Sequence, residues 1–254
     1  MLCTYISDIY NVDDAKSVAK AIDDIAAATD NDGWASNAVY CFWDPKSLEI
    51  LYIGLATDIY NRFRQHNGLI KCEENCCKVK EITKWFASNK DLGISLLLQS
   101  SCVQGRVSRN KGMPIVSSSM SRFSDVADIF DGKETIKMTE GLLIETHRLV
   151  FGKIPPWNKQ SGDTYGQKKA DIKGSSYIQR FTGELKDEFV SSKTIRQISQ
   201  NPTWLTFEMF LHGVRLQMAL HNIDFERALD SLPDLGRNKE DMQSEGYCIY
   251  TRGI

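Results

Sequence analysis

Four polar side chains that could bind a phosphate and move a proton lie between positions 40 and 66: Tyr40, Tyr52, Arg62 and His66. Arg62 and His66 are four residues apart, so on a helix they share one face. A guanidinium group donates strong hydrogen bonds to phosphate oxygens. A tyrosine beside a cation can have its pKa lowered enough to act as a base or to orient water. These four residues are therefore a candidate site for chemistry at a phosphate.

Local signals place the four side chains on a β-hairpin and on the helix that follows it. The runs 38–43 and 48–54 are rich in β-branched and aromatic residues, and Asp-Pro-Lys-Ser at 44–47 favours a turn between them. Thr57 or Asp58 is well placed to cap the next helix. The tyrosines and the helical pair would then converge from two strands and one helix.

This stretch resembles the GIY-YIG endonucleases. Residues 38–40 (Ala-Val-Tyr) match the first motif with alanine for glycine and valine for isoleucine, and residues 52–54 (Tyr-Ile-Gly) match the second motif. The arginine and histidine expected after the second motif fall on Arg62 and His66. The resemblance extends over residues 37–160. Each motif is short, but the ordered set is specific.

The segment 140–158 is similar to the closing part of that family, a helix with a metal-ligand glutamate followed by a Pro-x-Asn sequence. Glu145 fits that glutamate best, Glu140 is the competing assignment, and Pro156 and Asn158 follow. The resemblance implies a metal-dependent DNA endonuclease that uses Mg²⁺ or Mn²⁺. One carboxylate is enough for Mg²⁺, because this cation keeps most of its waters and takes phosphate oxygens from its substrate.

The resemblance also implies a role for each site residue. Tyr40 is the first choice for the general base, and Tyr52 and His66 would orient the water or relay its proton. Arg62 would donate to the non-bridging phosphate oxygens, where charge accumulates. Asn158 would brace the site by hydrogen bonds, with Glu145 as metal ligand and catalytic residue.

The fold expected from these signals is an α/β domain. Its third strand is the nearly continuous apolar run 93–103, which completes a small three-stranded mixed or antiparallel sheet flanked by helices. The chain is expected to divide into four regions: an acidic amphipathic helix within 1–36, a nuclease-like core at 37–161, a linker at 162–176 and a helical C-terminal region at 177–254.

A basic segment at 104–122 interrupts the core. It has no hydrophobic periodicity, and its cations are Arg106, Arg109, Lys111 and Arg122, with no acidic residue among them. We expect a loop that contacts the DNA backbone, with a solvated surface insertion as the alternative.

The C-terminal region contains a helix, an Asn-Pro break at 201–202 and a second helix, which superficially suits a helix-turn-helix. A recognition helix should expose Arg, Lys, Asn or Gln to base edges. The second helix is mostly apolar, so packing is the favoured interpretation.

Composition limits the remaining function classes. The 254-residue chain has a net charge of −2 and seven cysteines in no disulfide-like pattern, so we expect reduced thiols rather than a zinc cluster of His66 with Cys72, Cys76 and Cys77. No long apolar run exists, which predicts a cytoplasmic protein without a membrane partner. A DNA-binding module that does not cleave, and an interaction protein that uses the acidic N-terminal helix, remain alternatives. The oligomeric state, the DNA specificity and a restriction, repair or mobile-element role are left open.

Overall fold

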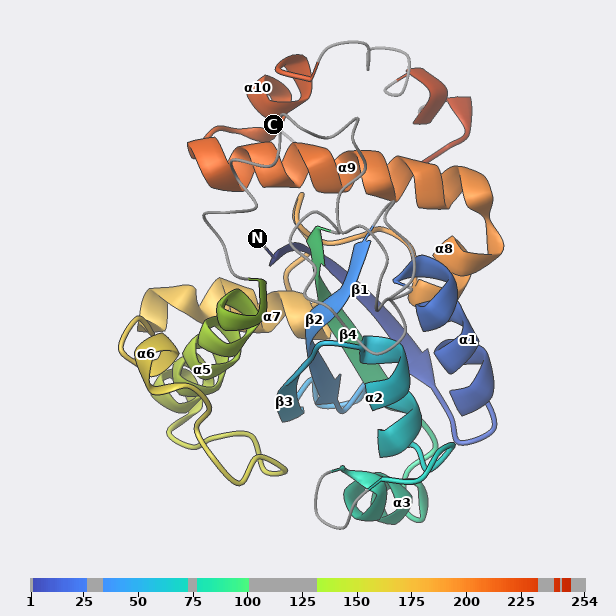
Figure 1. The fold of residues 1–254 in the computed structure, drawn as a ribbon, viewed down its shortest axis with the longest axis vertical. Coiled ribbons are helices and arrows are strands. Elements are labelled where there is room, and N and C mark those ends of the chain that lie inside the picture. Colours follow the sequence, from blue (N-terminus) through green and yellow to red (C-terminus); the bar gives the residue numbers. More distant parts are fainter. Residues whose placement is uncertain are drawn as a thin grey trace, which may run out of the picture.

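The computed structural model describes most of the chain (Figure 1), namely residues 2–26, 34–72, 77–100, 132–232, 240–242 and 244–247. A four-stranded antiparallel sheet lies at its centre, in the order β1-β4-β2-β3. Its strands are β1 (Leu2–Tyr10), β2 (Trp34–Trp43), β3 (Ile50–Ala56) and β4 (Leu92–Ser100). The expected α/β class, with helices flanking a small sheet, is confirmed.

The sheet has four strands rather than the three expected, because residues 2–10 form β1 at its edge and pair with β4. This strand carries Thr4 and Asp8, which are fully or almost fully buried. Their partners lie about 190 to 210 residues away, since Asp8 pairs with Arg196 and Thr4 contacts His212. Buried polar residues satisfied by such distant partners leave no local pattern. The expected amphipathic helix follows this strand and spans Ala15–Ile25.

Helices cover both faces of the sheet. Tyr40 and its neighbours on one face pack in an apolar cluster with α1 (Ala15–Ile25), α2 (Ile59–His66), α3 (Val79–Phe86) and α8 (Ile195–Gln200). The other face packs against α5 (Gly132–Phe151) and α7 (Ser175–Thr182). Two short elements, α6 (Thr164–Gln167) and the 3-10 helix η4 (Ile172–Gly174), lie beside α5 within the region expected to be a linker.

The C-terminal region is helical, as expected. Asn201 caps α9 (Pro202–His221), which crosses one end of the sheet and packs with α10 (Phe225–Asp230) in a separate apolar cluster. Arg215 of α9, a residue type that a recognition helix would expose, is instead buried, as are Glu208 and His212. The packing interpretation of this segment therefore fits the structure better than a helix-turn-helix.

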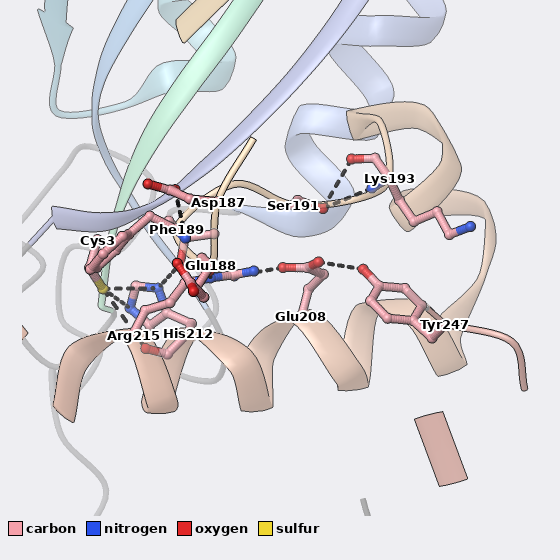
Figure 2. A network of polar contacts seen from close by, with 11 residues as sticks. Cys3, Asp187, Glu188, Phe189, Ser191, Lys193, Glu208, His212, Arg215 and Tyr247 are labelled. Carbon is pink, nitrogen blue, oxygen red and sulfur yellow. Dashed lines mark hydrogen bonds and ion pairs between the residues drawn. The ribbon is translucent and has the colours of Figure 1, made fainter. Parts of the chain in front are cut away.

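A buried polar network fastens α9 to β1 (Figure 2). The Arg215 guanidinium lies 2.7 Å from the Glu208 carboxylate and also donates to the Glu188 carbonyl at 2.6 Å. The Tyr247 hydroxyl donates to the second carboxylate oxygen of Glu208. One turn further along, His212 Nδ1 lies 2.7 Å from the Thr4 hydroxyl of β1. This network ties the helix to the strand through groups that water cannot reach.

No helix in the described part of the chain is long and apolar enough to cross a membrane. The basic segment 104–122 and the end of the run 93–103 lie outside the described residues, as does Cys76.

Candidate active site

The two tyrosines meet on one face of the β2–β3 hairpin. Tyr40 on β2 is paired directly with Gly54 on β3, and Tyr52 lies two residues before that glycine on the same face. A Cβ at Gly54 would lie 2.8 Å from both tyrosine hydroxyl oxygens and 2.6 Å from the Tyr52 ring. The space that glycine leaves is therefore what allows the two hydroxyls to converge. The ring centroids are 5.8 Å apart.

His66 is fixed in one tautomer by Lys78, the residue directly before α3. The backbone amide of Lys78 donates to its Nδ1 at 2.8 Å, so Nδ1 carries no proton. Burial, together with the charges of Arg62 and Lys78, holds the pKa of His66 well below its ordinary value. The ring is therefore neutral, and its one proton is on Nε2, which lies 2.6 Å from the Tyr40 hydroxyl oxygen. His66 donates to Tyr40 and cannot accept its proton in this state.

Arg62 reaches the same hydroxyl from the preceding turn of α2. Asp58 caps this helix by accepting from the Asn61 amide at 3.0 Å, which supports the expected start at 57 or 58. The Arg62 guanidinium hydrogen-bonds to Tyr40 and also donates to Gln65 at 3.2 Å. Two donors, one imidazole and one guanidinium, thus converge on the Tyr40 oxygen.

These donors do not outweigh the burial of the tyrosines. Burial and the neighbouring Tyr52 raise the pKa of Tyr40 well above its ordinary value, although Arg62 opposes this shift. Burial also raises the pKa of Tyr52. Both hydroxyls are neutral near pH 7. Additional positive charge close to Tyr40 would be needed to favour its phenolate.

Glu140 on α5 is the carboxylate that the structure places beside this group. The Leu55 backbone of β3 hydrogen-bonds to it, and it interacts electrostatically with both Arg62 and Tyr52. Burial raises the pKa of Glu140 to about 7, while Leu55 and Arg62 work in the opposite direction. The charge of Arg62 therefore compensates only in part for the burial of this carboxylate.

Glu145, the first choice from the sequence, lies on another side of the same helix. Five residues separate it from Glu140, which is 140° of rotation on an ideal α-helix at about 3.6 residues per turn. Its carboxylate forms two hydrogen bonds with Arg148, at 2.9 and 2.5 Å. That pairing lowers the pKa of Glu145. The geometry therefore favours the competing assignment, Glu140.

Three glycines hold α5 and α6 in backbone contact next to Glu140. A Cβ at Gly141 would lie 2.3 Å from the Asp163 carbonyl oxygen, and one at Gly166 would lie 2.1 Å from the Met138 carbonyl oxygen. Gly162 also approaches Gly141, with 3.0 Å between its Cβ position and the Gly141 Cα. No side chain fits between these segments, so the turn of α5 that carries Glu140 is fixed in position.

Asn158 secures the exposed edge of β3. Its side-chain oxygen accepts from the Ile53 amide at 2.9 Å, and its side-chain nitrogen donates to the Ile53 carbonyl at 2.7 Å. The Trp157 amide donates to the Leu51 carbonyl at 2.8 Å. Together with Glu140 at Leu55, these contacts occupy outward-facing backbone groups of an edge strand. Asn158 therefore has the bracing geometry expected of it.

Lys78 is a member of the site that sequence reasoning missed. Its Nζ lies 4.8 Å from the centroid of the Tyr52 ring and 3.7 Å from Glu81. Burial lowers the pKa of Lys78, and the nearby charges of Lys159 and Arg62 add to this effect. Lys78 lies twelve positions after His66 in the sequence, so no local spacing indicates their contact. Lys159 directly follows the Pro-Pro-Trp-Asn sequence, and this motif is what draws attention to that part of the sequence.

The donor groups available for a metal ion are few. Among the described residues, no three His, Cys, Asp or Glu side chains gather as a metal cluster would require. Glu140 is a single, partly buried carboxylate beside Arg62, a residue type that binds phosphate. This arrangement fits a cation that takes its other ligands from water and from phosphate. Arg106, Arg109, Lys111 and Arg122, the residues expected to bind nucleic acid, lie outside the described residues.

Comparison of the chain with protein families, with curated proteins and with solved structures finds no match.

Proposed function

We propose that this protein is a metal-dependent DNA endonuclease with a site of the GIY-YIG type. One observation carries the proposal: Tyr52, Arg62 and His66 converge on the hydroxyl group of Tyr40, and the carboxylate of Glu140 interacts with Arg62 and Tyr52 of that group. Each residue type alone has ordinary structural uses. Their combination provides a phosphate ligand, a water-orienting hydroxyl and a metal-binding carboxylate within one site.

Hydrolysis of a phosphodiester requires a bond from a water oxygen to phosphorus, loss of the bond to the leaving oxygen and a proton for that oxygen. In our proposal, Arg62 donates to the non-bridging oxygens as negative charge accumulates there. Solvent protonates the leaving oxygen, while Tyr40, whose own proton has first passed to solvent, orients the attacking water and accepts its proton. The two donors on its oxygen, His66 Nε2–H and Arg62, stabilise the phenolate that this step needs.

Glu140 would hold Mg²⁺ or Mn²⁺, which would supply positive charge that neutralises the phosphate and favours ionised Tyr40. The ionised form of Glu140 is the one that binds a cation. Tyr52 lies with its hydroxyl beside that of Tyr40 and extends the hydrogen-bonded group toward the substrate. Lys78, with its ammonium over the Tyr52 ring, is a second cation for the phosphate.

The experiment that tests this proposal is nicking or linearisation of supercoiled plasmid with Mg²⁺ or Mn²⁺. We expect metal-dependent cleavage by the wild type and its loss in Arg62→Ala. Arg64→Ala is a matched control, because Arg64 lies on the same helix and its guanidinium stacks on Tyr60 at 4.8 Å rather than contacting Tyr40. Absence of cleavage by the folded wild type on plasmid, branched and mismatched DNA would overturn it.

A second candidate function is nucleic-acid binding without cleavage. It is favoured by the pKa of Tyr40, which burial raises, and by Ala38 at the position where the family has glycine. A binding module would show salt-dependent affinity for DNA that Arg62→Ala weakens, with no product on any substrate.

A further inference from the structure

A hollow of about 480 Å³ opens beside the candidate site, between the chain that follows α2 and the first turn of α3. Three lysines from three different segments line it. Lys71 follows α2, Lys80 belongs to α3, and Lys159 directly follows Asn158. All three side chains are exposed to solvent. The hollow thus brings together in space three cations that lie far apart in the sequence.

The described lining of this hollow has an excess of positive charge. Glu81 is the carboxylate among those lining residues, and its oxygen lies 3.7 Å from the ammonium of Lys78. Within the part of the chain that the structure describes, Lys71, Lys80 and Lys159 form no ion pair. Cations that converge on a concave surface raise the local concentration of anions.

The hollow is continuous with the candidate site through Lys78 and Lys159. Lys78 contacts both sides: its backbone amide holds His66, and its ammonium lies over the Tyr52 ring and next to Glu81 of the hollow. Lys159 is joined to Asn158, whose side chain is paired with β3 beside the tyrosines. A strand of nucleic acid with one phosphate at Arg62 would thus find further cations along this direction.

We propose that the hollow lined by Lys71, Lys80 and Lys159 binds phosphates of the substrate strand on one side of the scissile bond. This inference rests on the proposed function, because it takes the ligand to be a nucleic acid. A polyanion suits the hollow better than one free phosphate, because the three ammonium groups come from three segments and each can pair with a different phosphate. Such contacts add affinity without sequence preference.

The test uses the full chain and a labelled DNA duplex of roughly 20 base pairs, in EDTA so that no strand is cut. Affinity is measured by fluorescence anisotropy between about 50 and about 200 mM NaCl. We expect the triple variant K71Q/K80Q/K159Q to bind more weakly and to lower the slope of log K against log salt by about 1 for each phosphate that a lysine no longer neutralises. The control K16Q/K46Q/K186Q removes the same charge from exposed lysines that do not line the hollow.

An unchanged slope and affinity in K71Q/K80Q/K159Q would overturn the inference, as would an equal loss in the control, since that would reflect net charge alone. Plasmid cleavage separates this outcome from failure of the proposed function. If the wild type cleaves DNA and the triple variant binds it normally, the phosphate site in the hollow is refuted and the proposed nuclease function stands. If the wild type does not cleave DNA but its binding depends on these lysines, the phosphate site stands and the proposed nuclease function is refuted.

Discussion

The Nε2 atom of His66 lies 2.6 Å from the hydroxyl oxygen of Tyr40, and the amide of Lys78 occupies the other ring nitrogen. The imidazole is thereby a hydrogen-bond donor to Tyr40. This relationship bears on the two roles that the resemblance leaves open for His66, orientation of the attacking water and relay of its proton. The first is the role that the described state permits.

The first prediction concerns that donor. His66→Phe should lower kcat for cleavage by roughly 10² to 10³, the effect of removing one donor to a developing negative charge. KM should change less, because a neutral Tyr40 needs this donor less than its phenolate does. His66→Gln, which retains an N–H group, should recover part of the activity. Steady-state cleavage of a labelled duplex measures both parameters. A Phe variant with the kcat of the wild type would contradict the role of His66.

The second prediction concerns Gly54. Gly54→Ala would place a methyl group 2.8 Å from the Tyr40 hydroxyl oxygen, so the two tyrosines must move apart. We expect loss of cleavage and a decrease of about 1 to 3 kcal/mol in the free energy of unfolding, the usual cost of overpacking. Urea denaturation and plasmid cleavage measure the two effects.

Gly213→Ala in α9 is the matched control for Gly54→Ala. The nearest atom to its added Cβ is 4.0 Å away, so the change meets no obstruction. Alanine is favoured over glycine within a helix by about 1 kcal/mol, so this variant should be active and no less stable. Full cleavage by Gly54→Ala would refute the idea that the glycine creates space for the hydroxyls.

The third prediction concerns the buried pair Glu208 and Arg215, which are exposed by 0% and 2% respectively. Glu208→Gln leaves the guanidinium of Arg215 buried without a counter-charge, so we expect a loss of about 3 to 5 kcal/mol in the free energy of unfolding. The double variant Glu208→Gln/Arg215→Met should lose less than the sum of the single variants. Additive losses in urea denaturation would show that the two side chains do not interact.

The fourth prediction concerns pH. Burial, with the charge of Arg215, lowers the pKa of His212 to about 3. The folded protein therefore keeps His212 neutral, whereas the unfolded chain protonates it below about pH 6.5. The stability that neutral His212 contributes is complete above that pH. It is lost as the pH falls toward 3, at up to about 1.4 kcal/mol per pH unit.

His212→Gln removes this titration. The variant should be less stable than the wild type at pH 8, because it alters the contact with Thr4, but its stability should fall less between pH 6 and pH 4. Denaturation with guanidinium at a series of pH values gives both slopes. Identical slopes would show that His212 is protonated as readily in the folded protein as in the unfolded chain.

The sequence predicts those features that depend on contacts between residues close together in the chain. The hairpin, the Asp58 cap and the Arg62–His66 face depend on neighbours within a few residues, and the structure contains all of them. Strand β1 was missed because Asp8 and Thr4 find their partners in α8 and α9. Local propensity gives little information about such distant partners.

The choice between Glu140 and Glu145 illustrates the same limit. Both lie on one amphipathic helix, and spacing to Asn158 does not decide between them. The deciding contacts are Gly141 against Asp163 and Glu140 against Leu55, which join segments far apart in the sequence. The cations of 104–122 were visible in the sequence, whereas Lys78 became a site residue only through the fold.

The most direct test of the account compares Glu140→Gln with Glu145→Gln in metal-dependent cleavage of supercoiled plasmid. Both changes remove one negative charge from the same helix, so they match in chemistry and in net charge. We predict that Glu140→Gln abolishes cleavage, because it removes the carboxylate proposed to hold the metal ion, whereas Glu145→Gln, which loses only its pairing with Arg148, cleaves as the wild type does. Cleavage that survives Glu140→Gln and is lost in Glu145→Gln would contradict the proposed site.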